Sequence, residues 1–176
     1  MNCSTSAHCL YSTKGAADHA LQITANHLPL THIRVGHFAT MTKVFTQEHV
    51  QQFASLVGDF NPAHFDDQYV QQEMKGIFKG KVVHGILVGG LISALAGTVL
   101  PGPGSIYLSQ NFRFVKPAYT NDLLCARVEC KKALNKSGNV FLFETTVTNQ
   151  TTGEVLINGE ATVYHPKLRL LQENSK

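Results

Sequence analysis

The sequence predicts a single α+β domain in which an antiparallel sheet wraps around one long, buried helix. Two observations carry this prediction. The 19 residues from Val82 to Leu100 contain no side chain that is charged at neutral pH, and four segments of alternating apolar residues follow them. One apolar helix followed by amphipathic strands is typical of a sheet packed against a helix rather than of alternating βαβ units. At 176 residues the chain is long enough to bury such a core without disulfides or metals.

Residues 1–34 differ in composition from the rest of the chain. They are rich in Ser, Thr, Ala and His and hold a single acidic residue, alongside Lys14 and Arg34. Few acids suit a mitochondrial transit peptide, although such peptides usually contain more arginine. Three interpretations remain: a cleaved leader, a disordered tail or a structural extension. A cleaved leader implies a mitochondrial location, and otherwise we expect a cytoplasmic one. We expect the leader to be dispensable for folding, the folded domain to cover residues 35–167, and residues 168–176 to form a tail.

The first elements of the domain are a strand at about residues 39–45 and a helix from Thr46 to Val57. The Thr46 hydroxyl can cap the start of this helix, and Gly58 is suited to end it. The apolar residues of the helix fall on one stripe: Val50, Phe53, Ala54 and Val57. A second, short helix is expected around residues 68–72.

The run from Val82 to Leu100 is nearly long enough to span a bilayer. It contains His84 and four glycines, however, and strands follow it, so we interpret it as a helix buried on all sides of a globular domain. Glycines inside a helix are costly, and close packing against the sheet is the expected compensation. The inward faces of the four following strands are Ile106, Leu108, Phe112 and Phe114; Leu124, Ala126, Val128 and Cys130; Phe141, Phe143, Thr145 and Val147; and Val155, Ile157, Ala161 and Val163.

Composition excludes several classes of protein. The 15 basic and 12 acidic residues give a net charge of +3, which is too small and too scattered for nucleic-acid binding. No C-x-x-C pair is present, so a zinc ribbon is not expected. Cys125 and Cys130 lie five residues apart, on opposite faces of a strand, and cannot bridge each other there. Walker A, dinucleotide-binding and G-x-S-x-G motifs are also absent.

A bend directly after the first helix gathers Asp59, Asn61 and His64 within six residues around Pro62. Proline fixes its own φ and disfavours the α conformation of the preceding residue, so the chain turns here instead of continuing the helix. Such a bend can aim Asp59 and His64 at one point, where a carboxylate and an imidazole hold a water molecule and exchange protons with it. The alternative is that Asp59 is a turn residue and His64 a half-buried structural side chain.

The start of the long helix holds His84 and Gly85. Free backbone N–H groups and the positive end of the helix dipole lie at such a start. Gly85 lets a ligand approach the backbone closely, so a carbonyl group placed there would have its developing negative charge stabilised. The alternatives are that Gly85 only allows tight packing and that His84 caps the helix start or packs against its neighbours.

The D-x-N-P-x-H motif at residues 59–64 is followed about twenty residues later by Val83-His84-Gly85-Ile86-Leu87. Together they resemble the MaoC-like, (R)-specific enoyl thioester hydratases, and residues 100–108 are similar to the segment that follows the central helix of those proteins. The resemblance covers residues 33–166. It implies a hot-dog fold, a homodimer, and the reversible hydration of trans-2-enoyl thioesters to (3R)-hydroxyacyl thioesters in fatty acid metabolism.

The resemblance also implies a role for individual residues. Asp59 and His64 match the catalytic pair that activates water, and Gly85 matches the glycine whose N–H faces the thioester oxygen. On the substrate-binding side, Asn61 supports the bend and Ser93 lines the acyl pocket. No cofactor or metal is implied, and coenzyme A or acyl carrier protein delivers the substrate. With its N-terminal extension, the chain looks like the mitochondrial 3-hydroxyacyl thioester dehydratases of type II fatty acid synthesis.

Three other functions compete with hydration. A hot-dog thioesterase would hydrolyse the same substrates, and a non-catalytic module would bind acyl thioesters without changing them. A hydrolase would bind a metal ion through His64, Asp66, Asp67 and His84, although acids after His64 can instead cap the next helix. The pairing of the D-x-N-P-x-H motif with the downstream His-Gly favours the hydratase over all three.

Overall fold

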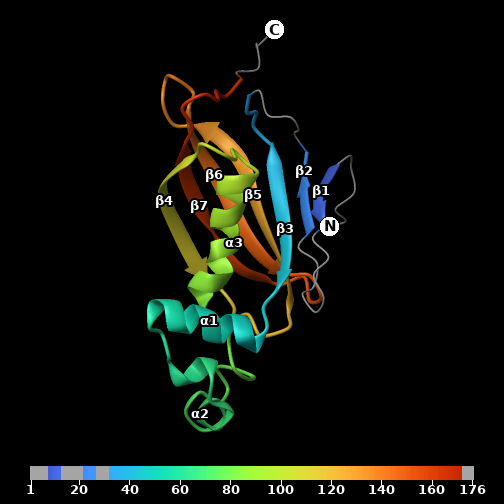
Figure 1. Ribbon diagram of the computed structural model, residues 1–176, viewed down its shortest axis with the longest axis vertical. Coiled ribbons are helices and arrows are strands. Elements are labelled where there is room, and N and C mark those ends of the chain that lie inside the picture. Colours follow the sequence, from blue (N-terminus) through green and yellow to red (C-terminus); the bar gives the residue numbers. More distant parts are fainter. Residues whose placement is uncertain (1–7, 13–21, 27–31, 172–176) are drawn as a thin grey trace.

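A computed structural model describes residues 8–12, 22–26 and 32–171 of the chain. Their seven strands form one antiparallel sheet in the order β1-β2-β3-β5-β6-β7-β4, which curves around helix α3 (Figure 1). Helices α1 and α2 lie at the end of the molecule where α3 begins. The elements in chain order are β1 (His8–Ser12), β2 (Gln22–Ala25), β3 (Phe38–Val44), α1 (Gln47–Val57), a 3₁₀ turn (Pro62–His64), α2 (Asp67–Glu73), α3 (Gly85–Thr98), β4 (Ile106–Phe114), β5 (Leu123–Ala133), β6 (Val140–Asn149) and β7 (Val155–Tyr164).

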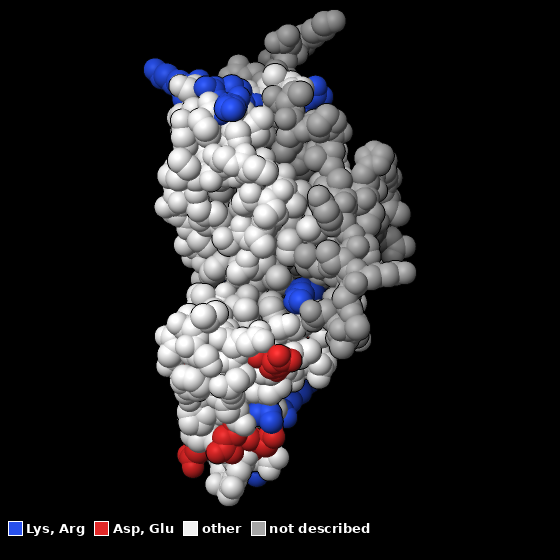
Figure 2. All heavy atoms as spheres, in the orientation of Figure 1, with Lys and Arg blue, Asp and Glu red and all other residues white. Residues whose placement is uncertain are grey.

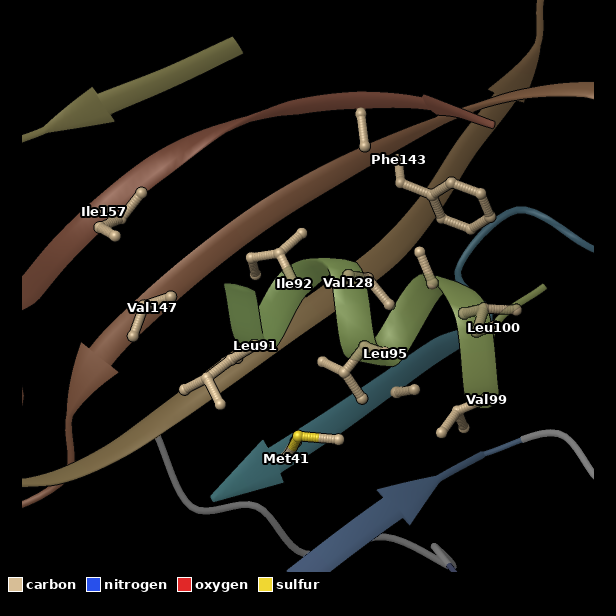
Figure 3. Packing of buried hydrophobic residues seen from close by; sticks show 14 of the residues in the cluster. Met41, Leu91, Ile92, Leu95, Val99, Leu100, Val128, Phe143, Val147 and Ile157 are labelled. Carbon is tan, nitrogen blue, oxygen red and sulfur yellow. The ribbon is translucent and has the colours of Figure 1, made fainter. Parts of the chain in front are cut away.

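The core forms where α3 packs on the sheet. Leu91, Ile92 and Leu95 of α3 lie against side chains of β3, β5, β6 and β7, among them Met41 and Phe143 (Figure 3). The predicted α+β fold with a sheet wrapped around one central helix is therefore confirmed. Within the described residues, no helix has both the length and the apolarity needed to cross a membrane.

The expectation that α3 is buried on all sides is wrong for one of its faces. Ile86, Gly90, Ser93 and Gly97 recur at helical spacing and are exposed in the single chain. The expected close packing of glycines holds on another face. A Cβ added to Gly85 would lie 2.7 Å from the ring of Phe114, and one added to Gly89 would lie as close to the ring of Phe112.

The alternating pattern predicts the inward faces of β5 and β6 correctly, and those of β7 except at Val155, which is exposed at the strand's start. On β4 the prediction is wrong for Ile106, Leu108 and Phe114, each more than half exposed. Strand β4 is the last strand of the sheet, so it has a neighbour on one side only. Its pairing with β7 is also irregular between Tyr107 and Ser109, which interrupts the alternation.

The side chains of two cysteines, Cys125 and Cys130, are described, and we expected no disulfide between them. Cys130 is a free thiol, and no disulfide joins it to Cys125. Burial, and next the negative charge of Glu129, raise the pKa of the Cys130 thiol to about 12. Cys130 therefore stays protonated at physiological pH, and it is a packing residue of the core rather than a nucleophile.

The ends of the domain differ from the expected boundaries at residues 34 and 168. Strand β2 lies within the expected leader, yet it pairs with β3 and buries Ile23 and Ala25. Ile33 is fully buried, and the backbone N–H of Leu171 donates to its carbonyl oxygen, so part of the expected tail runs beside it. Leu168 is buried too. The sheet needs these segments to cover its apolar residues, which composition alone does not reveal.

We therefore expect Ile23→Ala to lower the free energy of unfolding by about 2–5 kcal/mol, because it removes a buried side chain from the sheet. Chemical denaturation measures this change. The control is Gln22→Ala on the same strand, whose side chain is exposed and whose replacement should matter by less than about 0.5 kcal/mol. Equal stability of both variants would show that β2 is a dispensable leader after all.

Candidate active site

The bend that carries the site begins where α1 ends. Gly58 has a φ of 82°, a left-handed conformation that glycine adopts without strain, and its N–H donates to the carbonyl oxygen of Ala54. Asn61 is extended, as expected for a residue before proline, and its Oδ1 accepts from the N–H of Ala63 at 3.0 Å. The bend is thus fixed by hydrogen bonds of its own residues, including the Asn61 side chain, and it places the side chains of Asp59 and His64 next to each other.

His64 is held in one orientation and one tautomer. Its Nδ1 lies 2.7 Å from the carbonyl oxygen of Val82, in the segment that leads into α3. Because a carbonyl oxygen only accepts hydrogen bonds, Nδ1 carries the proton of the neutral ring and Nε2 is left as an acceptor. The side chain of Gln47 in α1 also donates to the His64 carbonyl oxygen at 3.0 Å, so the backbone is tied down as well. A neutral His64 therefore presents a base at Nε2.

Asp59 faces that base. Its Oδ1 accepts from the N–H of Asn61 at 3.2 Å, and its Oδ2 lies 3.9 Å from Nε2 of His64. The two atoms are too far apart for a direct hydrogen bond. A water molecule between them can donate one O–H to each acceptor at about 2.8 Å. The carboxylate is half exposed while His64 is mostly buried, so the pair meets solvent from one side.

His84 completes the cluster, and from the sequence it was grouped with His64 only in the metal alternative. Its ring stacks on that of His64 with centroids 3.7 Å apart. Its Nε2 lies 2.9 Å from the backbone carbonyl oxygen of Asp59 and 3.9 Å from Oδ2 of the same residue. The expectation that His84 caps the start of α3 is wrong, because its side chain makes no capping hydrogen bond. The expectation that it packs is correct: the ring is buried and lies beside Phe53.

The first turn of α3 adds backbone donors to this cluster. Gly85 is the first residue of the helix, and the N–H groups of a first helical turn have no carbonyl partner within the helix. The positive end of the helix dipole lies at the same place. The close approach of Phe114 to Gly85 shows that packing also requires a glycine here, so both interpretations of Gly85 are compatible with the structure.

A cavity of about 580 Å³ opens beside these groups and includes His64 and Gly85 in its wall. This volume is typical of small-molecule sites. Most of the wall is apolar and comes from the segment between α2 and α3, the start of α3, the end of β4 with the residues after it, and β7. These residues are Ile77, Phe78, Val83, Ile86, Phe114, Val115, Ala118, Leu156 and Ile157. Asp59 is not part of the wall, but it lies beside His64, which is. An apolar cavity with an imidazole in its wall suits a substrate with a hydrocarbon chain and one reactive polar group.

The structure places Asp59 beside His64, and it places His64 and Gly85 in the wall of the same cavity, but Ser93 is not part of that wall. Ser93 is exposed on the outer face of α3 and lies outside the cavity wall. Eight residues separate it from Gly85, or about 12 Å along a helix. Asn61 is outside the wall too, and it uses its side chain to fix the bend.

The remaining wall residues escaped prediction, since they lie far apart in the sequence. Phe114 ends β4 and Val115 follows it, while Leu156 and Ile157 lie on β7. The signal that could have identified Val115 is its apolar character just before Lys116 and Pro117, where a strand end would normally be polar. The β4–β7 pairing, which brings these segments to one place, is not visible in the sequence.

The atoms of Asp59, His64 and His84 also lie close enough to hold a metal ion, within 4.8 Å of one another. An imidazole binds a metal through a lone pair in the plane of its ring. The two rings are stacked with an interplanar angle of 27°, so their lone pairs run side by side and do not converge. The other acids of the metal alternative are engaged elsewhere: Asp66 caps α2, and Asp67 pairs with Lys81. The geometry favours a water molecule here over a metal ion.

Charges around the site are mixed in sign. On the face shown in Figure 2, the end formed by α1 and α2 carries both acidic and basic side chains, and the middle of the described surface is mostly uncharged. At the cavity, Lys116 forms an ion pair with Glu154, and the hydrogen bond from Lys116 lowers the pKa of the Glu154 carboxyl. The opposite end of this face shows basic side chains only, so the mixture of signs is found at the end near the site (Figure 2).

The chain is also similar to a known domain family and to proteins of known name and structure. Residues 25–155 match the model of the MaoC like domain. The chain is 39% identical over 134 residues to a Rhodospirillum rubrum protein named (R)-specific enoyl-CoA hydratase, covering 76% of this chain and 89% of that protein. It is 32% identical over 146 residues to the mitochondrial 3-hydroxyacyl-[acyl-carrier-protein] dehydratase of Arabidopsis thaliana, covering 82% and 84%. The solved structure of the (R)-hydratase of A. caviae superposes with a TM-score of 0.70 at 36% identity, covering 78% of this chain and all of that one.

Proposed function

Because this chain belongs to the MaoC-like domain family, we propose that it is a hydro-lyase that interconverts trans-2-enoyl thioesters and (3R)-hydroxyacyl thioesters in fatty acid metabolism. Its relatives are named as hydratases and dehydratases of such thioesters. The observation that carries the proposal is the 3.9 Å gap between Asp59 Oδ2 and His64 Nε2, with His64 in the wall of an apolar cavity.

Hydration adds the oxygen of water to Cβ of the enoyl group and a proton to Cα. The water must lose a proton as its oxygen attacks, and Cα must gain one as the double bond disappears. Asp59 and His64 both accept from the same water, so together they remove one proton and return one. The reverse reaction uses the same groups in the opposite order, with a proton taken from Cα and hydroxide leaving as water.

Negative charge develops on the thioester oxygen while the new bond to Cβ forms. The N–H of Gly85 at the start of α3 is the donor that meets this charge, and the helix dipole adds to it. The acyl chain then extends along the apolar wall of the cavity. No redox step occurs in this reaction, because one water molecule is added and no electrons are exchanged with a second reactant.

The test is an assay of the purified protein with crotonyl and longer trans-2-enoyl thioesters of both coenzyme A and acyl carrier protein. We expect loss of the conjugated enoyl thioester and formation of the (3R)-hydroxyacyl thioester, identified by chiral analysis. Free acid and free thiol would instead show a thioesterase. Binding of the thioester without any product would show a non-catalytic module. The same assay identifies the carrier. The charges near the cavity do not identify it, because Lys81 and Lys116 already pair with carboxylates of this chain.

A homodimer is part of the proposal. Strand β4 ends the sheet, and in the described part of the chain only β7 pairs with it. Ile106, Leu108 and Phe114 of β4 are all more than half exposed. An apolar edge strand is a ready template for pairing with another chain, and a second copy would cover it. Light scattering should give twice the mass of one chain, and a monomeric mass at micromolar concentration would contradict the homodimer.

A mitochondrial location is also proposed. Its support is the acid-poor composition of residues 1–34 and the mitochondrial relative in Arabidopsis thaliana. Because β2 carries buried side chains, cleavage that preserves the core must occur before Gln22. A fluorescent protein fused after residue 21 should enter mitochondria and lose the leader. A cytoplasmic signal from that fusion would favour the cytoplasmic alternative.

A further inference from the structure

His84 combines deep burial with an unsatisfied polar atom. Its side chain is 2% exposed, and Nδ1 is a buried nitrogen for which the described residues supply no hydrogen-bond partner. A buried polar atom without a partner is costly and calls for an explanation. His165 shows what a structural histidine looks like in this protein. It is buried too, but its Nε2 contacts the Pro103 carbonyl oxygen and its Nδ1 accepts from the N–H of Leu168.

The satisfied nitrogen of His84 points at the catalytic residues. Nε2 lies 2.9 Å from the Asp59 carbonyl oxygen, and a carbonyl oxygen only accepts, so the neutral ring carries its proton on Nε2. The opposite tautomer would leave the Asp59 carbonyl oxygen without this donor. His84 therefore donates its one ring N–H, at Nε2, to the backbone of Asp59, and Nδ1 is left without a hydrogen-bond partner among the described residues. We call this hydrogen bond the clamp.

The flat face of His84 meets the second catalytic residue. The rings of His64 and His84 stack with centroids 3.7 Å apart and an interplanar angle of 27°. His64 is also bound at its edge by the Val82 carbonyl oxygen, through Nδ1. The edge contact alone leaves the ring free to swing about the hydrogen bond, whereas the stack fixes its plane. Together the two contacts determine where Nε2 of His64 points.

We propose that His84 is a positioning residue that ties three parts of the reaction site together. It clamps the backbone of Asp59, it sets the ring plane of His64, and it directly precedes Gly85, whose N–H meets the thioester oxygen. This role rests on the proposed hydration. His84 exchanges no proton with the substrate. Its function is to hold the carboxylate of Asp59, the imidazole of His64 and the N–H of Gly85 in fixed positions relative to one another. Misplacing a reacting group by about 1 Å costs on the order of 100-fold in rate.

Two variants separate the clamp from the stack. His84→Phe keeps a flat ring against His64 and removes the donor to the Asp59 carbonyl oxygen. His84→Gln keeps an N–H donor near the position of Nε2 and removes the ring. We expect each to lower kcat by about 10- to 100-fold with KM changed by less than threefold, because substrate binding relies on the cavity wall. Circular dichroism should show that both variants are folded under the assay conditions, so that unfolding does not explain the lower kcat.

The matched control is His165→Gln, which replaces an equally buried histidine outside the cavity wall. It should lower the thermal midpoint, while the folded protein keeps its kcat. A structural role for His84 would give the same result as this control: lower stability with normal kcat in the folded fraction. That outcome in both His84 variants would overturn the proposal.

A second measurement needs neither substrate nor variant. Nitrogen-15 spectra of the histidine side chains in the wild-type protein report which ring nitrogen carries the proton. We expect the proton on Nε2 in His84 and on Nδ1 in His64. A proton on Nδ1 of His84 would overturn the clamp even if the variants failed to fold. Absence of hydration in the wild-type protein would instead refute the proposed function, so the two failures are distinguishable.

Discussion

Asp59→Asn and His64→Asn should each lower kcat for hydration of crotonyl-CoA by about 100- to 10,000-fold, equal to roughly 3–5 kcal/mol of activation barrier. Asp59→Asn keeps an oxygen for the N–H of Asn61 and removes the negative charge and the basicity. His64→Asn places an amide N–H where Nδ1–H stood, so the bond to the Val82 carbonyl oxygen can persist, and it removes the base at Nε2. Steady-state kinetics measures both effects.

Stability should change much less than activity. Asp59 is half exposed, and both changes retain a hydrogen bond to the backbone. Thermal unfolding of each variant checks this point. The matched control is Asp67→Asn, the same chemical change at an acid eight residues away that pairs with Lys81 at the surface. It should leave kcat within about twofold, since an exposed ion pair contributes about 1 kcal/mol or less to stability and nothing to the site.

The double variant of Asp59 and His64 tests whether the two residues act on one water molecule. Groups that work as a unit are not additive in their effects on rate. We therefore expect the double variant to be little slower than the slower single variant. Full additivity would show separate roles, and a folded His64→Asn protein with normal kcat would reject the hydration mechanism in favour of the binding module.

The fold could be predicted from the sequence wherever the pattern is local. Helix α1 begins after Thr46 and ends before Gly58, as its capping residues indicate. The alternating residues of β5 and β6 predict their buried faces because both strands lie inside the sheet. Strand β2 was missed because four residues, Gln22–Ala25, are too short for a periodic signal. Its burial depends on pairing with β3, a contact made across the intervening chain.

The candidate site, too, could be predicted only where its residues are close together in the sequence. Asp59 and His64 lie within one bend, whose geometry follows from Gly58 and Pro62. The importance of His84 was not predictable, because it depends on how the bend packs against the start of α3. The resemblance assigned Ser93 to the acyl pocket. In the structure of the single chain, however, Ser93 is exposed on the outer face of the helix.

Gly85→Pro should lower kcat by about 100-fold or more, because it removes the N–H that meets the thioester oxygen, and loss of one such donor typically has an effect of this size. Proline is tolerated in the first turn of a helix, where its missing N–H has no helical partner. Every replacement of Gly85 also adds a Cβ 2.7 Å from the Phe114 ring, so a slower variant could reflect that collision alone.

Gly85→Ala separates the two causes, since it adds the same Cβ and keeps the N–H. We expect Gly85→Ala to lose some stability and to retain far more activity than Gly85→Pro. Combining each change with Phe114→Leu relieves the collision, because the half-exposed ring is removed from the path of the Cβ. In that background the alanine variant should approach the activity of Phe114→Leu alone, while the proline variant stays about 100-fold slower. If the alanine and proline variants are equally slow in both backgrounds and both are folded, Gly85 serves packing, and the donor to the thioester oxygen lies elsewhere in the site.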